Sequence, residues 1–347
     1  MRNNVCRDFI IIGPNYYNYA YSTVRTIKNM GYSVSFFEEK EFYNHCSYLQ
    51  RKFYKFGLQF IKDKWDKRWN DDLLTFIRKN ADENTVLLFL AGGELISTNT
   101  LLELSKYRKI LMLWDSIRRF SIGAQKQLGL YDKVYVFEYD DISYIKDTFD
   151  MNNISYLPLG YDENIYFARQ EERRIDMAFV GAVTPDRFRI LEHVAKYAIT
   201  HHLHLVVVGK WFNDKWPWMV WKFKRKHPEL YSCLINHNVP PEETAHIYRH
   251  SKIVLNINNS VHKSISPRTF EILATRTFQL MNKGQESNGT LNLDSDLVMF
   301  ENDADLLQKI RYFISNEKER IRIMEKGHMD VQKFSLSNLL QRVVHEL

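Results

Sequence analysis

Short apolar runs alternate with helix-length amphipathic segments along the whole chain, and this alternation constrains the fold more than any other feature. Such a pattern predicts parallel sheets whose strands are joined by helical crossovers. In the first half we expect strands at residues 9–13, 33–37, 86–90, 109–113, 133–137 and 154–157. In the second half we expect strands at residues 177–181, 204–209, 233–236, 253–257, 277–281 and 297–300. The chain therefore contains two similar sets of predicted strands.

The two halves also open alike. Residues 8–14, Asp-Phe-Ile-Ile-Ile-Gly-Pro, lead into a helical segment and a second strand, and residues 176–182, Asp-Met-Ala-Phe-Val-Gly-Ala, do the same. A strand, a glycine turn, a helix and a strand form the opening of a doubly wound sheet. A length of 347 residues suits two domains. We therefore predict an α/β fold of two Rossmann-like, doubly wound parallel-sheet domains that face each other across a cleft, the architecture called GT-B.

The linker between the two predicted domains is indicated by residues 158–174, which contain proline, glycine and many charged residues. We place an N-terminal Rossmann-like domain at 1–168 and a C-terminal Rossmann-like domain at 169–330. The remaining segment, 331–347, is expected to form a helix that packs back on the N-terminal domain.

The composition bounds the class of protein without choosing a function. No apolar run is long enough to cross a bilayer, the N-terminus lacks a signal-peptide core, and three scattered cysteines suit a reducing compartment. We expect a cytoplasmic protein. The net charge of +6 is compatible with an enzyme for anionic substrates, a nucleic-acid-binding protein or a peripheral membrane protein.

A cation in the first turn of a predicted helix is the strongest indication of a site. Ser266 and Pro267 start this helix after a polar loop that includes Asn256 and Lys263, and Arg268 follows at once. The start of a helix carries partial positive charge, so Arg268 is unfavourable there unless an anion binds beside it. Because ligands bind at the carboxyl ends of strands in such sheets, we expect Arg268, Lys263 and the helix amides to hold a diphosphate.

Glu271, one turn further along the same helix, is placed to accept hydrogen bonds from a sugar hydroxyl such as that of a ribose. The alternative is a simple ion pair between Arg268 and Glu271 at a spacing of three residues, worth only about 0.2 to 0.5 kcal/mol on an exposed helix.

These residues resemble a known signature. Tyr248, the segment 251–257 (Ser-Lys-Ile-Val-Leu-Asn-Ile) and the segment 268–274 (Arg-Thr-Phe-Glu-Ile-Leu-Ala) resemble the C-terminal pattern of CgeB-like, spore-maturation-type glycosyltransferases. Residues 157–162 and the pair Trp114-Asp115 resemble further segments of these proteins. The resemblance covers roughly residues 150–285 and implies a GT-B fold with a nucleotide-sugar donor bound mainly by the second domain. It also implies that Glu271 contacts the donor's ribose and Arg268 its diphosphate.

This chain departs from the resemblance at two positions. Lys263 stands where related retaining transferases have a glutamate that grips the donor sugar, so the sugar contact and the stereochemistry stay open. Arg276 stands where the family usually has glycine. We therefore expect the helix end to turn without the left-handed conformation that glycine adopts easily.

Two glycine turns are further candidates for the donor site. Gly181 follows the first strand of the second domain, and Arg187 in the helix after it is placed to reach phosphates; Arg187 and its neighbour Arg189 are alternatively solvated helix charges. Gly209 and Lys210 end the next strand and are candidates for the base pocket.

The acceptor site and any catalytic base are expected in the first domain. The tyrosines between Gly13 and Tyr19 suit stacking on sugars. Glu94, in a glycine loop after the third strand, and Asp115, after the fourth, are the two candidate bases for an inverting reaction. Either carboxylate could instead cap the next helix.

Residues 210–226 combine four of the seven tryptophans with many basic residues. This mixture suits an anionic membrane surface and would fit a lipid-linked acceptor. The alternative is a helix that covers the sheet with its tryptophans buried.

The sequence as a whole predicts a glycosyltransferase that moves a sugar from a nucleotide-sugar donor to a glycan or lipid-linked acceptor in bacterial surface-polysaccharide synthesis. No metal and no cofactor beyond the nucleotide sugar, whose base is unknown, is expected. The protein would act in the cytoplasm or at the inner face of the cytoplasmic membrane, without binding nucleic acid. The alternatives are a nucleotide-sugar epimerase of the same fold and a non-catalytic protein that binds nucleic acid or membrane.

Overall fold

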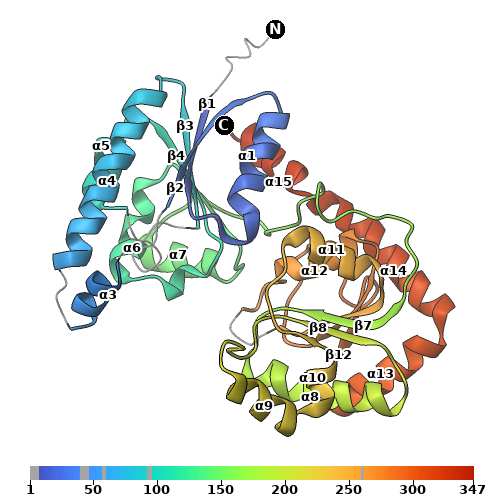
Figure 1. Cartoon of the computed structure of the whole chain (residues 1–347). Coiled ribbons are helices and arrows are strands. Elements are labelled where there is room, and N and C mark those ends of the chain that lie inside the picture. Colours follow the sequence, from blue (N-terminus) through green and yellow to red (C-terminus); the bar gives the residue numbers. More distant parts are fainter. Residues whose placement is uncertain (1–7, 40–46, 57–59, 92–95, 259–261) are drawn as a thin grey trace. The chain divides into compact units, whose positions relative to one another are not determined.

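The computed structural model describes residues 8–39, 47–56, 60–91, 96–258 and 262–347 of the chain (Figure 1). It divides into two compact units. The first comprises Met1–Leu159 together with Leu340–Leu347, and the second comprises Gly160–Leu339.

The first unit is built on a six-stranded parallel sheet in the order β2-β1-β3-β4-β5-β6. Its strands are β1 (Asp8–Gly13), β2 (Ser33–Glu38), β3 (Val86–Leu90), β4 (Arg108–Met112), β5 (Lys133–Val136) and β6 (Ile154–Tyr156). Its helices are η1 (Tyr16–Asn18), α1 (Tyr19–Asn29), α3 (Tyr48–Lys55), α4 (Phe60–Asn80), α5 (Thr98–Glu103), η2 (Ile117–Arg119), α6 (Ile122–Lys126), η3 (Gln127–Leu130) and α7 (Asp141–Phe149).

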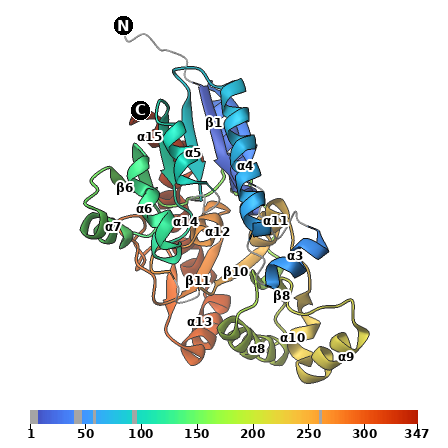
Figure 2. The ribbon, with the colours of Figure 1, turned by 90° about the vertical axis from the view of Figure 1, so that its left-hand side faces the viewer.

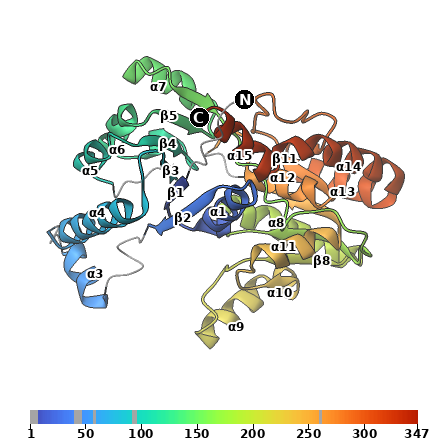
Figure 3. The same cartoon turned by 90° about the horizontal axis from the view of Figure 1, so that it is seen from above.

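Helices cover both faces of this sheet, with α4 and α5 on one side and α1 and α15 on the other (Figures 1 and 3). The apolar side chains of β3 are therefore buried along the whole strand, as expected for a central parallel strand. Trp69, Leu73 and Ile77 of α4 pack against the core that Ile10 and Phe89 share.

The second unit contains another six-stranded parallel sheet, in the order β12-β11-β10-β7-β8-β9. Its strands are β7 (Ile175–Val180), β8 (Leu205–Val208), β9 (Leu234–Ile235), β10 (Ser251–Asn256), β11 (Phe278–Asn282) and β12 (Val298–Phe300). Its helices are α8 (Pro185–Thr200), α9 (Pro217–Lys226), α10 (Pro228–Ser232), α11 (Pro241–Arg249), α12 (Pro267–Ala274), α13 (Asp303–Ser315), α14 (Glu317–Val331) and η4 (Gln332–Phe334), followed by the start of α15 (Leu336–His345).

In this unit α11, α12 and α14 cover one face of the sheet, and α8, α9, α10 and α13 cover the other (Figure 1). The strand order is that of a dinucleotide-binding Rossmann sheet. All strands are parallel, and successive strands are added outward on one side from β7 to β9 and on the other side from β10 to β12. All the strands expected from the sequence are present, each within two residues of its expected bounds. The predicted fold class, with two doubly wound parallel sheets, is confirmed.

The end of α15 belongs to the first unit. Arg108 donates hydrogen bonds to the carbonyl oxygens of Glu346 and Leu347 at 2.9 and 2.6 Å, and the Tyr135 hydroxyl donates to the Glu346 carboxylate at 2.7 Å. Leu340 and Val343 are buried. The last residues of the chain are thus tied to the sheet of the first unit.

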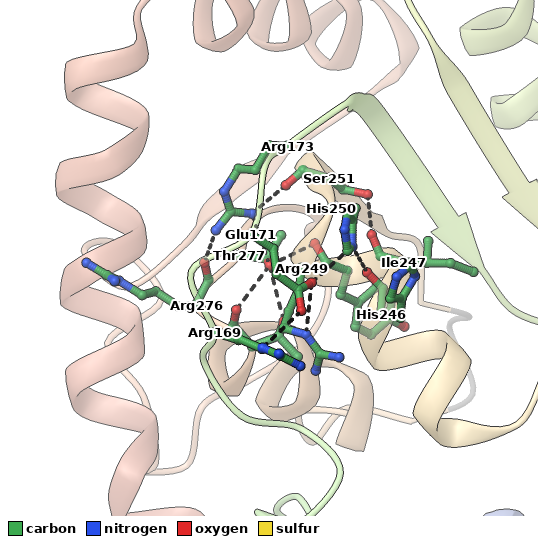
Figure 4. A network of polar contacts seen from close by, with 12 residues as sticks. Arg169, Glu171, Arg173, His246, Ile247, Arg249, His250, Ser251, Arg276 and Thr277 are labelled. Atoms are coloured by element: carbon green, nitrogen blue, oxygen red, sulfur yellow. Dashed lines mark hydrogen bonds and ion pairs between the residues drawn. The ribbon is translucent and has the colours of Figure 1, made fainter.

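The end of α12 differs from the expectation for Arg276. Its φ is +55°, so this arginine does adopt the left-handed conformation that glycine usually supplies at a helix end. The surrounding contacts hold it there: its side chain forms an ion pair with Glu325, and its carbonyl oxygen accepts a hydrogen bond from Arg173. Arg173 also donates to the carbonyl oxygen of Ser251 at 2.5 Å, which joins the starts of β10 and β11 in one polar network (Figure 4).

Candidate functional site

The point where the second sheet reverses its strand order organises the candidate site. Loops leave the adjacent strands β7 and β10 in opposite directions there, toward α8 and α12, and ligands of open α/β sheets bind at such a switch point. Gly181 directly follows β7, and the segment from Asn258 to Ser266 contains the described residues that join β10 to α12. Four of the residues predicted from the sequence therefore lie around one end of the sheet: Gly181, Arg187, Asn256 and Arg268.

The start of α12 keeps its partial positive charge. Ser266 occupies the N-cap position, but its hydroxyl donates to the side-chain oxygen of Asn258 at 2.8 Å. The Ser266 side chain therefore makes no cap hydrogen bond to the helix, and the Ser266 amide donates to Gln285 Oε1 at 3.4 Å. Pro267 follows, as the sequence indicates, and the Thr269 amide donates to the carbonyl oxygen of Ser266 at 3.0 Å, so the helix start has no side-chain N-cap from Ser266. An anion is the ligand that such a helix start favours.

Arg268 is held at this helix start by two aromatic residues. Its guanidinium carbon lies 5.7 Å from the centre of the buried Phe179 ring, and it lies close enough to the hydroxyl of Tyr248 to affect the pKa of that group. A Cβ on Gly181 would lie 2.8 Å from the guanidinium nitrogen Nη2, closer than a side chain can approach. Gly181 therefore provides the space that the Arg268 side chain occupies beside the turn after β7.

The partner that orients Arg268 is uncharged. Tyr248 is fully buried, and burial raises the pKa of its hydroxyl far above the usual value, although the positive charge of Arg268 acts in the opposite direction. The negative charge of Glu271 adds to the rise. The contact with Tyr248 therefore positions the guanidinium without neutralising it.

Arg187 is a second cation beside the same ring, and it is buried. Its Nε donates to the carbonyl oxygen of Ile257 at 2.8 Å and its Nη1 to that of Ala182 at 3.0 Å, and its guanidinium carbon lies 5.7 Å from the Phe179 ring centre. The side chain is only 9% exposed, so the alternative of a solvated helix charge is wrong for Arg187. That alternative describes Arg189, which is exposed and forms an ion pair with Asp303.

The turns after β7 and β8 pack so closely that glycine is needed at position 209. A Cβ on Gly209, whose φ is +153°, would lie 2.2 Å from the carbonyl oxygen of Gly181. Lys210 is exposed and forms an ion pair with Asp214 at 2.5 Å, which makes it a surface residue next to the turn. The indole Nε1 of Trp211 is buried and has no hydrogen-bond partner among the described residues.

Asn256 has a different role from the one predicted. It is fully buried, and its amide nitrogen donates to Thr269 Oγ1 at 2.9 Å and to Gln279 Oε1 at 3.0 Å. These bonds attach α12 to β10 and β11. We therefore correct the assignment: Asn256 positions the helix that carries Arg268, since it is not exposed to a ligand.

Lys263 and Glu271 flank the helix start. Lys263 is exposed, and its carbonyl oxygen accepts a hydrogen bond from the amide of Glu286 at 2.7 Å. Glu271 is partly exposed on the second turn of α12, close enough to influence the titration of Tyr248. Both side chains already have partners within the protein, so a ligand would have to compete with or join these contacts.

The structure describes only one of the two candidate bases of the first unit. Glu94 lies outside the described residues. The Asp115 carboxylate accepts from the amide of Ser116 at 2.7 Å and from Nη1 of Arg119 at 2.8 and 3.0 Å, whereas Ser116 occupies the N-cap of the following helix η2, so the capping alternative does not describe Asp115.

Sequence reasoning missed Asp141, a carboxylate close to Asp115. It is buried and accepts from the Ser116 hydroxyl and the Ile117 amide, both at 2.9 Å. Burial raises the pKa of Asp141, although these hydrogen bonds act in the opposite direction. No local pattern distinguishes Asp141 from the other acidic residues at the start of α7, because its burial depends on contacts with a distant loop.

The loop after β1 contains two adjacent left-handed residues. Tyr17 has a φ of +48° and Asn18 a φ of +68°, which is uncommon for residues with a side chain. Tyr17 is 85% exposed, and Tyr19 packs on Trp114 with ring centres 5.7 Å apart. The tyrosines of this loop therefore follow the carboxyl end of β1, with Tyr16 and Tyr17 exposed to solvent.

The helix in the aromatic and basic segment does not bury its tryptophans. Trp216, Trp218 and Trp221 are each more than half exposed, whereas Phe223 packs inward against Phe212 at a ring-centre distance of 4.5 Å. The alternative of a covering helix with buried tryptophans is wrong for these three residues. Among the helices that the structure describes, none has the length and apolar character needed to cross a membrane.

Known proteins share this architecture. A family model described as glycosyl transferase-like matches residues 187–343, which include both Arg187 and α12. Sucrose-phosphate synthase from Thermosynechococcus elongatus superposes over 98% of both chains with a TM-score of 0.66 at 12% identity. HepE from Anabaena has been solved in complex with UDP and with UDP-glucose. The UDP complex superposes over 98% of this chain and 99% of HepE, with a TM-score of 0.63 at 7% identity.

TarM superposes over 78% of this chain with a TM-score of 0.56 at 12% identity, and the chain spans only 56% of TarM. No curated protein matches the sequence. At these identities the superpositions show the GT-B fold alone, and the family model adds a glycosyl transferase-like domain at residues 187–343.

Proposed function

We propose that this protein is a glycosyltransferase that moves a sugar from a nucleotide-sugar donor to a glycan or lipid-linked acceptor in bacterial surface-polysaccharide synthesis. One observation carries the proposal: Arg268 lies at the uncapped start of α12, fitted against Gly181 at the switch point of a Rossmann sheet. HepE, which has the same fold, binds UDP and UDP-glucose, and this supports a nucleotide-sugar donor here.

In the proposed reaction the donor diphosphate binds between Arg268 and the turn at Gly181. Negative charge develops on the diphosphate as the bond to the sugar breaks, and a fixed cation together with helix amides stabilises that charge. Because these groups are already oriented by Tyr248 and Phe179, little reorganisation is needed during the reaction. In this proposal the step needs no metal ion, and the nucleotide sugar is the only co-substrate.

Glu271 and Trp211 are proposed to contact the nucleoside. The Glu271 carboxylate would accept hydrogen bonds from the ribose, and the unpartnered indole of Trp211 would donate to the ligand. Lys263 stands where a sugar-binding glutamate would be expected, so the proposal leaves the donor sugar and the stereochemistry open. We also propose, from residues 248–274, that the chain is CgeB-like.

The acceptor is proposed to bind to the first unit, at the carboxyl end of its sheet. Tyr17 offers an exposed ring for stacking on a sugar, and Glu94 and Asp115 stay the candidate bases. The exposed tryptophans of α9 support a position at the inner face of the cytoplasmic membrane, where Arg225, 5.2 Å from the Trp221 ring centre, would lie among anionic headgroups. A lipid-linked acceptor would be accessible there.

The test of the donor site is a thermal-shift screen of nucleotides and nucleotide sugars, followed by calorimetric titration of the best ligand. A ligand that binds only the folded protein raises its melting temperature. Arg268→Ala should weaken donor binding by about 10- to 100-fold, because a hydrogen bond to a charged group contributes about 1.5 to 3 kcal/mol.

The matched control is Arg189→Ala, which removes an exposed arginine from the neighbouring helix α8. It should leave donor affinity unchanged. Equal donor affinities of the native protein and Arg268→Ala would show that the donor does not bind at α12. Failure of every nucleotide and nucleotide sugar to bind would instead contradict the donor class.

A further inference from the structure

Helix α3 of the first unit has no buried residue. Tyr48 is 69% exposed, Leu49 62% and Phe53 48%, and Phe56, which follows the helix, is 80% exposed. The helix lies beside the start of α4 (Figures 1 and 2). A contiguous exposed apolar patch of this kind on a folded protein marks an interaction surface.

The helix is nevertheless well specified by its own sequence. Ser47 and Gln50 form a capping box: the Ser47 hydroxyl accepts from the Gln50 amide at 3.3 Å, and the Gln50 side chain accepts from the Ser47 amide at 2.8 Å. Such reciprocal bonds define a helix start without help from a core. The capping box therefore explains why α3 is helical. Burial in a core does not explain its apolar side chains, because none of its residues is buried.

The exposed side chains are sorted by face. With about 100° between successive residues of a helix, Leu49, Phe53 and Phe56 project within an arc of about 60°. Lys52 and Lys55 project on one flank of that arc, and the Lys52 ammonium lies 4.9 Å from the Tyr48 ring centre. The half-buried Tyr54 projects on the opposite side. The outer surface of α3 is thus an apolar face bordered by cations and a tyrosine.

The charge of residues 47–62 favours one class of partner. Residues 47–62 contain four basic residues and no aspartate or glutamate. A second copy of the same surface would bring like charges together, which opposes self-association. Nucleic acid would satisfy the cations but would leave Leu49 in the middle of the surface without a stacking partner. An anionic lipid surface satisfies both parts, because acyl chains accept the apolar face and headgroups accept the lysines.

We propose that α3 is an interfacial helix that docks the first unit on an anionic lipid bilayer. Leu49, Phe53 and Phe56 enter the boundary between headgroups and acyl chains. Lys52 and Lys55 extend along that boundary to the headgroup phosphates, and Tyr48 lies at headgroup depth. This inference goes beyond the proposed glycosyl transfer and does not depend on it. It also rests on other residues than the contact proposed for α9.

The experiment is co-sedimentation of the full chain with phosphatidylcholine vesicles that either contain or lack phosphatidylglycerol. No nucleotide or sugar is present, so the result is independent of the donor site. The test variant is Leu49→Ser/Phe53→Ser, in which both replaced side chains are largely exposed. The matched control is Ile199→Ser/Tyr312→Ser, which replaces two exposed apolar side chains of α8 and α13.

We expect binding to vesicles with phosphatidylglycerol, little binding to pure phosphatidylcholine, and an at least tenfold weaker partition, roughly, for Leu49→Ser/Phe53→Ser. Lys52→Glu/Lys55→Glu should abolish the dependence on phosphatidylglycerol. The control should bind as the native chain does, with all variants melting at the native temperature.

Equal binding of the native chain and Leu49→Ser/Phe53→Ser would overturn the proposal. So would a dimer, seen by sedimentation velocity without lipid, that this variant converts to a monomer, because the occupant would then be a second copy. Loss of vesicle binding only in Trp218→Ser/Trp221→Ser would transfer the lipid contact to α9 and contradict a role for α3.

Discussion

Arg268 occupies a position that is electrostatically unfavourable in the free protein. It adds a cation to the positive end of α12, and the neutral hydroxyl of Tyr248 orients this cation without cancelling its charge. A folded chain keeps such an arrangement where a ligand offsets the cost. The residue that best accommodates it is Gly181, whose missing side chain leaves room for the guanidinium.

Gly181→Ala should therefore damage donor binding more than folding. The new Cβ would lie 2.8 Å from Nη2 of Arg268, a contact that the flexible guanidinium relieves by moving away. We expect about a tenfold loss of nucleotide-sugar affinity in calorimetric titration, with a melting temperature close to that of the native chain. Gly129→Ala, at a glycine with open space around it, is the control and should bind normally. Unchanged affinity in Gly181→Ala would show that the position of Arg268 does not matter.

Asp141 gives a pH-dependent prediction in the first unit. Its pKa is raised in the folded state by burial, so its contribution to stability is complete below the pKa of an unfolded aspartate and is lost as the pH rises through the folded pKa. Asp141→Asn keeps an acceptor for the Ile117 amide but does not titrate. Urea unfolding between pH 4 and pH 8 should show a smaller loss of stability with rising pH for Asp141→Asn than for the native chain. Parallel profiles would contradict this account.

Sequence patterns predicted the helix that starts at Ser266 and carries Arg268, but they could not separate residues that differ only in burial. Arg187 and Arg189 lie two positions apart in one helix, yet Arg187 is buried against Phe179 and Arg189 is exposed. The difference depends on how α8 is rotated against the sheet, which its own sequence does not determine. The same reason explains Asn256, whose polar side chain suggested a ligand contact although it joins α12 to the sheet.

Among the secondary-structure elements, α12 connects the candidate site to a polar network at the other end of the sheet. Its first turn carries Arg268, and its end is fixed by Arg276 in a left-handed conformation that Glu325 and Arg173 hold. The strands could be predicted because apolar runs of five or six residues between polar segments specify them locally. The exposure of the tryptophans of α9 could not be predicted, because an aromatic helix that covers a sheet has the same composition.

Two substitutions at the end of α12 should separate backbone strain from the ion pair. Both Arg276→Gly and Arg276→Ala remove the contact with Glu325, but only glycine adopts a φ of +55° without steric cost. We expect Arg276→Ala to have a free energy of unfolding about 1 kcal/mol lower than that of Arg276→Gly in urea denaturation. If alanine is as stable as glycine here, the left-handed conformation is not strained.

At the scale of the whole molecule, the chain returns to its first unit at the end. Residues 340–347 contribute the buried Leu340 and Val343 and the hydrogen bonds of Glu346 and Leu347 to that unit. Two separate cores accompany the two repeated strand patterns. The packing of the last helix on the first unit was only expected from the sequence, because an amphipathic pattern does not specify which core the helix covers.

Deletion of residues 340–347 should weaken the first unit selectively. Loss of two buried aliphatic side chains alone costs about 4 kcal/mol or more. Hydrogen exchange should become faster in β4 and β5, which contact this segment through Arg108 and Tyr135, while the strands of the second unit keep their native rates. Glu346→Ala, which removes the hydrogen bond to Tyr135 and the ion pair with Lys133, is the milder control. Uniform protection in both units after deletion would contradict the assignment of this segment.

The central claim is that a nucleotide diphosphate binds at the switch point of the second sheet. Hydrogen exchange of the full chain, measured with and without the nucleotide diphosphate that gives the largest thermal shift, tests it most directly. The account predicts slower exchange in two segments, residues 179–189 and the start of α12 at residues 266–271, and loss of both effects in Arg268→Ala. Slower exchange confined to other strands, or unchanged protection in Arg268→Ala, would contradict it.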